Sequence, residues 1–241
     1  GNMPLDGGNL IINDEDLNEF ISKEPKAKKY ILPLISAREF LNRKNRWCLW
    51  LESIEPKDLK SMPFVLERVK AVKAFRMASK APATQKHAAT PTLFRDRNRP
   101  HTFIVVPRVS SENRKYSPMG FFGYESIVSD TCMSIPNGTL YNFGVLMSEM
   151  HMAWVKYTCG RLKSDFRYSK DLVYNNYPWP KEVSNKNKKA VETKAQNVLD
   201  IRAEFPESSL ADLYDPLTMP PKLVKAHQAL DKAVDLCYRP Q

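Results

Sequence analysis

Hydrophobic periodicity changes near residue 145, and this change divides the chain into two parts. Beyond it, three segments carry apolar residues at helical spacing, which predicts helices over 148–159, 184–205 and 221–237. The last helix is the most regular and begins at Pro220-Pro221. Its single apolar stripe consists of Leu223, Ala226, His227, Leu230, Ala233, Val234 and Cys237. We therefore expect a helical C-terminal segment over residues 146–241.

The first 145 residues mix helical and extended signals. The acidic residues that follow Asn13 are typical of a helix start, and Pro63 suits the first turn of a second helix, with Val65, Val69 and Val72 on one side. Apolar composition predicts strands over 46–52, 102–109 and 139–145, with an irregular basic loop over 82–99. Together the two parts predict an α+β fold, in which the helical segment packs on a mixed α/β domain over residues 1–145.

Composition excludes several classes of protein. Hydrophobic residues make up 42% of the 241 residues and charged residues 27%, which is typical of a globular chain rather than a disordered one. The apolar runs are far shorter than the roughly 20 residues of a membrane span. The four cysteines, Cys48, Cys132, Cys159 and Cys237, are spaced neither as a disulfide framework nor as a metal knuckle. We expect a soluble, reduced, cytoplasmic protein without a metal site or a membrane partner.

Positive charge is concentrated in one quarter of the chain. The formal net charge is +10, and the stretch from Lys57 to Ser117 holds 14 basic residues against four acidic ones, while the remainder holds 23 of each. An excess of this kind favours a polyanionic partner, because neutralised phosphates release counterions. A solvated basic face without a partner is the alternative. A membrane-surface helix is disfavoured, since the stretch never forms one long amphipathic helix.

The sequence contains no recognisable active site. His151 and Cys159 are eight positions apart on one expected helix, about 80° around it and roughly 12 Å along it, so they cannot touch. His227 lies within an apolar stripe, where a packed histidine is the simplest interpretation. Glycine-rich phosphate loops and the H-E-x-x-H zinc motif are absent from the sequence.

One short motif is similar to a catalytic one. The run Asn175-Asn176-Tyr177-Pro178-Trp179-Pro180 resembles the Asn/Asp-Pro-Pro-aromatic tetrapeptide with which DNA amino-methyltransferases hold a flipped base. Only one proline follows the tyrosine, however, and no glycine-rich S-adenosylmethionine loop precedes it. We interpret the motif as an aromatic–proline packing corner.

Longer segments resemble one family from Asn2 to Tyr238. They are MPLDGGNL, SAREFLN followed by RWCLWL, PRVSSENRKY, LYNFGVLMSEMHMAWVKYTCGRLKSDFRYS, VYNNYPWP and SLADLYDPLTMPPKLVKAHQALDKAVD. They are similar to the C-terminal part of MmeI-like single-chain type II restriction–modification enzymes and related class I adenine-specific DNA methyltransferases. In such enzymes this part is a target-recognition domain followed by a helical segment, and it selects the DNA sequence to be methylated.

The resemblance implies which partner this chain binds and which catalytic domain lies elsewhere in the polypeptide. This chain alone is then no enzyme: it is the recognition fragment of a prokaryotic polypeptide, and it binds double-stranded DNA. The methyltransferase domain, with its S-adenosylmethionine, would lie upstream in the same polypeptide, and a nuclease, where there is one, further upstream still. No cofactor is expected on this chain.

Candidate DNA contacts follow from charge and side-chain chemistry. If residues 111–116 are extended, Glu112 and Arg114 project to the same side. The carboxylate accepts from the cytosine amino group and the guanidinium donates to guanine, so the two fit one C·G pair. Ser79 and Lys80 are second candidates for base reading. The expected backbone contacts are Lys73, Arg76, Arg95, Arg97, Arg99, Arg108, Ser110, Ser111 and Lys115.

Two other interpretations remain open at this point. Glu112 and Arg114 can equally form a surface ion pair worth less than about 1 kcal/mol. The whole chain can also be an RNA- or protein-binding module without DNA specificity, or an enzyme of unrecognised chemistry. Competition between duplex DNA and structured RNA separates the binding alternatives.

Overall fold

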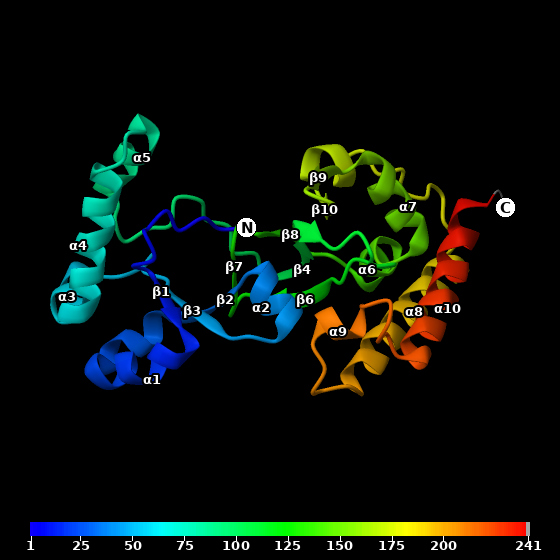
Figure 1. Ribbon diagram of the computed structural model, residues 1–241, viewed down its shortest axis with the longest axis horizontal. Helices are drawn as coiled ribbons and strands as arrows, with labels where there is room; N and C mark the ends of the chain where they lie inside the picture. Colours follow the sequence, from blue (N-terminus) through cyan, green and yellow to red (C-terminus); the bar gives the residue numbers. More distant parts are fainter. Residues whose placement is uncertain (240–241) are drawn as a thin grey trace. The chain divides into compact units, whose positions relative to one another are not determined.

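The computed structural model describes residues 1–239, which form two compact units. The first unit consists of residues 1–39, 44–99 and 124–130, and the second of residues 40–43, 100–123 and those from Thr131 onward. Residues on both sides of position 145 share the second unit (Figure 1). Compact units and functional domains need not coincide, so the boundary at residue 145 stays a prediction about function.

The first unit is built on a four-stranded sheet in the order β1-β3-β2-β7. Its strands are β1 (Ile11–Asn13), β2 (Ile31–Ile35), β3 (Arg46–Leu49) and β7 (Ile127–Val128), and only the β2–β7 pair is parallel. Its helices are α1 (Asp14–Lys23), α3 (Pro56–Lys60), α4 (Pro63–Met77) and α5 (Pro82–Lys86), with 3-10 turns η1 (Pro25–Tyr30) and η2 (His87–Ala89). The helix starts expected at Asn13 and Pro63 and the strand that begins at Arg46 are confirmed.

The second unit contains two three-stranded sheets and the C-terminal helices. One sheet has the order β6-β4-β8, with β4 (Thr102–Pro107) between β6 (Gly120–Gly123) and β8 (Cys132–Pro136). The other has the order β5-β10-β9, formed by β5 (Val109–Ser110), β9 (Gly160–Leu162) and β10 (Asp165–Arg167). The helices are α6 (Leu140–Leu146), α7 (Glu149–Thr158), the π-helical η3 (Lys170–Tyr174), α8 (Asn185–Ala203), α9 (Leu210–Leu213) and α10 (Pro221–Tyr238). Helix α2 (Ala37–Asn42) joins the two units in sequence.

The C-terminal helices confirm the expected periodicity. Ser148 and Ser184 cap α7 and α8 by accepting hydrogen bonds from the backbone N–H three residues on. The expected stripe of α10 is buried, and helix α6 approaches α8 closely at Gly144, where a Cβ would lie 2.7 Å from Val191 Cγ1. In the described residues no helix has the length and apolarity of a membrane span.

The strand expected over 139–145 is instead helix α6, so that prediction was wrong. The hydroxyl of Thr139 accepts from the Asn142 N–H at 3.2 Å, and the Asn142 side-chain oxygen accepts from the Thr139 N–H at 3.0 Å. This reciprocal capping box satisfies two backbone donors that a helix start otherwise leaves unpaired. Local capping and the burial of Phe143 and Val145 outweigh the extended tendency of the segment.

Both histidines singled out in the sequence are packed in the interior of the second unit. The ring of His151 is hydrogen-bonded to Leu146 O at 2.7 Å and to the Tyr168 hydroxyl at 2.9 Å, and His227 Nε2 lies 2.9 Å from the Tyr214 hydroxyl. Burial lowers the pKa of His151 to about 4 and that of His227 to about 3. Each is therefore neutral in the folded chain at physiological pH.

These buried histidines predict a loss of stability in mild acid. Below about pH 6.5 the unfolded chain protonates each histidine while the folded chain does not, so folding is disfavoured as the pH falls toward the folded pKa values. When the pH falls from 7.5 to 5.5, we expect each buried histidine to lower the free energy of unfolding by about 1.4 kcal/mol. Urea unfolding at both pH values measures this difference. In the His151→Gln variant, the change in unfolding free energy between the two pH values should be about half as large. An unfolding free energy that stays constant between the two pH values would contradict the assignment.

Candidate nucleic-acid interface

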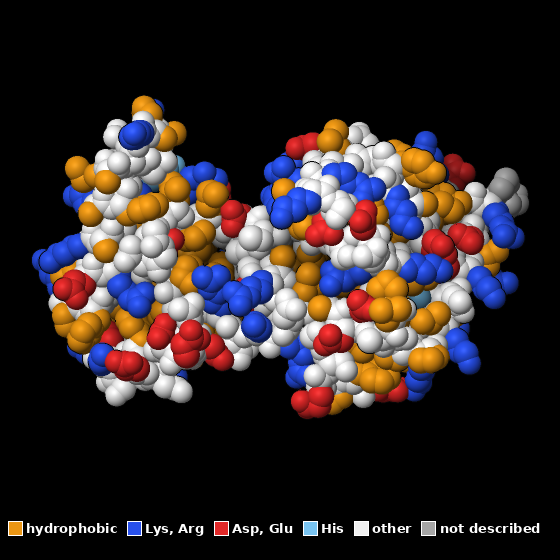
Figure 2. Space-filling model, viewed as in Figure 1, with side chains coloured by type: hydrophobic (Ala, Val, Ile, Leu, Met, Phe, Trp, Pro, Cys, Tyr) orange, Lys and Arg blue, Asp and Glu red, His pale blue; other side chains and the backbone are white. Residues whose placement is uncertain are grey.

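The basic stretch from Lys57 to Ser117 is shared between the two units. Residues 57–99 belong to the first unit and residues 100–117 to the second. The two pairs of base-reading candidates therefore lie on different units, with Ser79 and Lys80 on the first and Glu112 and Arg114 on the second. Figure 2 shows lysine and arginine side chains on both units, interspersed with acidic ones.

The end of helix α4 presents the candidates of the first unit. Lys73 and Lys80 are exposed, and within residues 1–239 neither has an ion-pair partner. Ser79 is half-buried: its hydroxyl accepts from the Ala81 N–H at 3.2 Å and its carbonyl accepts from the Gln85 side chain at 2.8 Å. Lys80 thus lies between the end of α4 and the short helix α5, and its ammonium is available to an anion.

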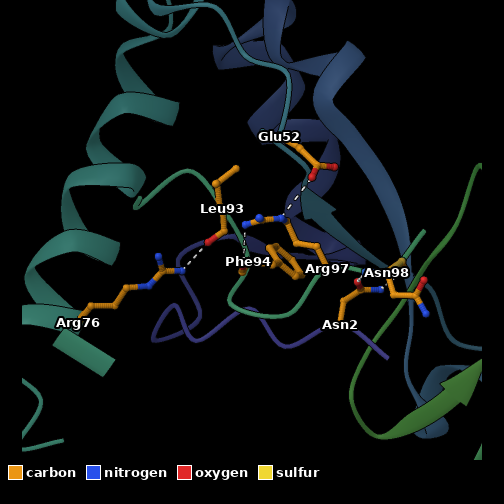
Figure 3. A network of polar contacts seen from close by, with 7 residues as sticks. All are labelled: Asn2, Glu52, Arg76, Leu93, Phe94, Arg97 and Asn98. Atoms are coloured by element: carbon orange, nitrogen blue, oxygen red, sulfur yellow. Dashed lines mark hydrogen bonds and ion pairs between the residues drawn. The ribbon is translucent and has the colours of Figure 1, made fainter. Parts of the chain in front are cut away.

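Arg76 is not a DNA contact, which corrects the expectation from the sequence. Its side chain is fully buried, and its guanidinium donates five hydrogen bonds of 2.7–2.9 Å to backbone carbonyls, those of Pro4, Leu5, His87, Thr90 and Leu93. Figure 3 shows the bond to Leu93. Arg76 follows Val72 by four positions, so it continues the buried stripe of α4 rather than the exposed face of Lys73. This spacing was the signal in the sequence that placed it inside.

The three alternating arginines of the basic loop all have partners in the first unit. Arg95 pairs with Asp96 at 2.5 Å, and Arg97 lies 3.2 Å from Glu52 while donating to Phe94 O at 3.1 Å (Figure 3). Arg99 donates to the Tyr124 carbonyl at 2.9 Å, and its guanidinium lies 3.6 Å from the centre of the Tyr124 ring. Arg95 and Arg97 are exposed, and surface pairs of this kind are weak enough for a phosphate to compete.

The segment that carries Glu112 and Arg114 is a turn, so the condition stated above, an extended backbone over residues 111–116, is not met. The Arg114 N–H donates to Ser111 O at 3.2 Å, and the Ser111 hydroxyl accepts from the Asn113 N–H at 3.3 Å. Glu112 is exposed, with its carboxylate 3.7 Å from Arg161. The turn closes because two local hydrogen bonds replace strand pairing after β5.

Arg114 differs from the other arginines of the basic stretch. It is half-buried, and burial lowers the pKa of its guanidinium. The negative charges of Asp165 and Asp215 partly offset this lowering. No ion pair to it occurs within the described part of the chain. A guanidinium that is already partly desolvated and lacks a direct partner loses less hydration when it meets an acceptor.

The remaining candidates of the second unit differ in accessibility. Arg108 is exposed, and no ion pair is formed by it in residues 1–239, whereas Lys115 lies 3.2 Å from Glu149. The Ser110 hydroxyl is buried in β5 without a hydrogen-bond partner, so in this conformation it cannot reach a phosphate, contrary to expectation. Ser111 is half-buried with its hydroxyl engaged in the turn.

A buried network anchors the C-terminal end of the turn. The Tyr116 hydroxyl donates to the Asp231 carboxylate of α10 at 2.7 Å, and the other oxygen of that carboxylate accepts from the Glu149 N–H at 2.8 Å. The Tyr116 ring stacks on His227 with the ring centres 4.0 Å apart. Burial raises the pKa of both Tyr116 and Asp231. No local pattern predicts this contact, because it joins residues that are 115 positions apart.

The motif that resembles a methyltransferase tetrapeptide packs as an aromatic corner. Tyr177 is buried, its ring lies 4.9 Å from that of His151 and 5.3 Å from that of Trp179, and its hydroxyl accepts from Tyr238 at 2.7 Å. The Asn176 amide donates to the carbonyls of Asp171 and Leu172. Because both residues are committed to packing and backbone contacts, the motif does not fit a cofactor or a flipped base.

Comparison with known proteins identifies the family. The model of the MmeI target recognition domain matches residues 1–181, and that of the MmeI C-terminal domain matches residues 183–241. The chain belongs to the MmeI family. It is 43% identical over 240 residues to DNA methyltransferase A of Bacillus subtilis, covering 99% of this chain and 27% of that protein.

A solved relative has the same architecture. The structure of the type IIL restriction-modification enzyme MmeI in complex with DNA matches all of this chain and 32% of that one, with a TM-score of 0.97 and 42% identity. In terms of the MmeI family, the Tyr116–Asp231 hydrogen bond joins the target recognition domain to the C-terminal domain.

The contrast between Arg76 and Lys73 predicts different effects of the same substitution. Arg76→Met leaves five backbone carbonyls without their donor and should lower the free energy of unfolding by more than about 3 kcal/mol. Lys73→Met, on the exposed face of the same helix, should change it by less than about 0.5 kcal/mol. Urea unfolding compares the two variants, and equal stability would show that the buried guanidinium is not structural.

Proposed function

We propose that this chain is the DNA-sequence-recognition module of a larger adenine-specific DNA methyltransferase or combined restriction–modification polypeptide. The observation that carries the proposal is the end-to-end similarity to MmeI, whose structure was solved in complex with DNA. The concentrated basic charge supports it independently. Because the chain spans 27% of DNA methyltransferase A, we assign methyl transfer and S-adenosylmethionine binding to the rest of the polypeptide. The whole polypeptide would act on DNA in the prokaryotic cytoplasm.

Exposed cations provide affinity in this proposal. Lys73 and Arg108 are exposed and form no ion pair within residues 1–239, so they meet a phosphate without first losing a partner. Arg95, Arg97, Arg99, Ser111 and Lys115 contact the backbone in exchange for their present partners. Such contacts fix the register of a module on the duplex without reading sequence.

The 111–115 turn provides specificity. Glu112 offers only acceptors and Arg114 only donors, so their chemistry complements the cytosine amino group and the guanine O6 and N7 acceptors of one base pair. Because the segment is a turn, the pairing rests on this chemistry and not on a shared face of an extended strand. The partial burial of Arg114 favours a base edge over a solvated phosphate. Ser79 and Lys80 are the corresponding candidates on the first unit. Specific contacts of this kind help to offset the few kcal/mol needed to flip an adenine out of the duplex.

Duplex binding is expected to depend steeply on salt. Affinity should fall at least tenfold between about 50 and 200 mM salt, because each phosphate contact adds about −0.9 to the slope of log K against log salt. Lys73→Ala and Arg108→Ala should each reduce the slope by about that amount, and Lys222→Ala, a matched control on α10, should not. Fluorescence anisotropy measures these values. Salt-independent binding, or equal competition by structured RNA, would contradict the proposal.

A charge swap tests base reading by the turn. Glu112→Lys with Arg114→Asp should move the base preference at one position by about 1–3 kcal/mol of discrimination while preserving the fold. The control is the swap Glu204→Lys with Lys222→Glu, since this exposed, oppositely charged pair has no place in the proposed interface. Selection from a randomised duplex pool reports every position at once. The pair does not read bases if the double variant selects the wild-type sequence.

A further inference from the structure

In the β9–β10 hairpin of the second unit, Phe166 is the only strand residue that belongs to the core. All three residues of β9 are exposed, and in β10 only Phe166 is buried. The hairpin is nevertheless held in place, because Phe166 pairs with Arg161 on one side and with Ser110 of β5 on the other. An exposed ribbon on a fixed base is suited to contacting a partner rather than to stabilising the fold.

The hairpin carries its own positive charge outside the basic stretch of the sequence. Residues 160–167 contain three basic residues, Arg161, Lys163 and Arg167, and one acidic residue, Asp165. Lys163 lies at the tip with a φ of 55°, and both Lys163 and Arg167 are exposed without an ion-pair partner in the part of the chain that the structure describes. The charge is therefore available to an anion.

The same hairpin borders the proposed base-reading turn. Strand β5, to which β10 is hydrogen-bonded, runs directly into residues 111–115. Arg161 Nη1 lies 3.7 Å from a Glu112 carboxylate oxygen, and Asp165 is one of two carboxylates that stabilise the charge of Arg114. The turn and the hairpin thus have complementary charges, and Arg161 offsets the repulsion that Glu112 would experience close to phosphates.

Arg161 is oriented by two contacts and retains free donors. Its guanidinium lies 4.2 Å from the centre of the Phe166 ring, and Nη1 donates to Ser164 O at 2.8 Å. A guanidinium has five N–H donors, so most of them remain for a ligand. The side chain is 43% exposed, which leaves it accessible.

We propose that the β9–β10 hairpin is a second DNA-reading element, in which Arg161 contacts a base edge next to the pair read by Glu112 and Arg114, and Lys163 and Arg167 contact phosphates. The proposal rests on the proposed function. The major groove of B-DNA admits a two-stranded β-ribbon, and a bidentate arginine contact to guanine is the commonest specific contact in that groove. Cross-strand stacking on Phe166 limits the conformational freedom that Arg161 loses on binding.

The test is selection from a randomised duplex pool with the 241-residue chain and its variants. Arg161→Gln keeps the stem on Phe166 but removes the charge, and it should lower discrimination at one position by between roughly fivefold and a hundredfold. Lys163→Ala and Arg167→Ala should weaken binding to all sequences alike and each reduce the salt slope by about 0.9. Lys222→Gln on α10 is the matched control, and circular dichroism verifies folding.

The outcomes separate this proposal from the proposed function. If the wild-type chain selects a sequence and Arg161→Gln selects the same one with unchanged discrimination, the hairpin is not a reading element although the chain still recognises DNA. If the wild-type chain selects no sequence, both fail. Loss of preference at a single position in Arg161→Gln, with the control unchanged, supports the hairpin. Should that variant unfold, Arg161→Lys repeats the test with the charge kept and the bidentate geometry lost.

Discussion

The hydrogen bond from Tyr116 to Asp231 is the contact on which the proposed reading surface depends. It fixes one end of the 111–115 turn on helix α10, while the pairing of β5 with β10 fixes the other end. Asp231 is held in turn by the Glu149 N–H at the start of α7. A turn with both ends fixed on helices and a sheet presents its side chains in a defined geometry, which sequence discrimination requires. The segment that matches the MmeI C-terminal domain thereby supports the proposed reading turn in this chain.

Burial distinguishes the roles of arginines that look equivalent in the sequence. Arg76 is fully buried and saturated by five carbonyls, so it ties the N-terminal segment and the loop after α5 to helix α4. Arg114 is half-buried without an ion pair among the described residues, and Arg95 and Arg97 are exposed and paired. The saturated guanidinium of Arg76 therefore stabilises the fold. Arg114 retains donors for a base, and the weakly paired Arg95 and Arg97 retain charge for a phosphate.

Local signals predicted the parts of the fold that local interactions determine. Helices α4, α7, α8 and α10 followed from apolar spacing and caps, and strands β3 and β4 from their apolar runs. The segment 139–145 was misjudged because its capping box competes with its extended composition. The 111–116 segment is not extended because one backbone–backbone and one backbone–side-chain hydrogen bond close a turn. The order β5-β10-β9 and the Tyr116–Asp231 contact join distant residues, so only the structure revealed what supports the turn and that the hairpin borders it.

Hydrogen–deuterium exchange of the chain with and without its selected duplex tests the central claim, that the second unit reads DNA through the turn and its hairpin. The account predicts that backbone amides of residues 109–116 and 160–167 exchange more slowly with the duplex bound, while those of α10 stay unchanged because that helix supports the turn from inside. Unchanged exchange over both segments, with protection confined to α8 and α10, would contradict it.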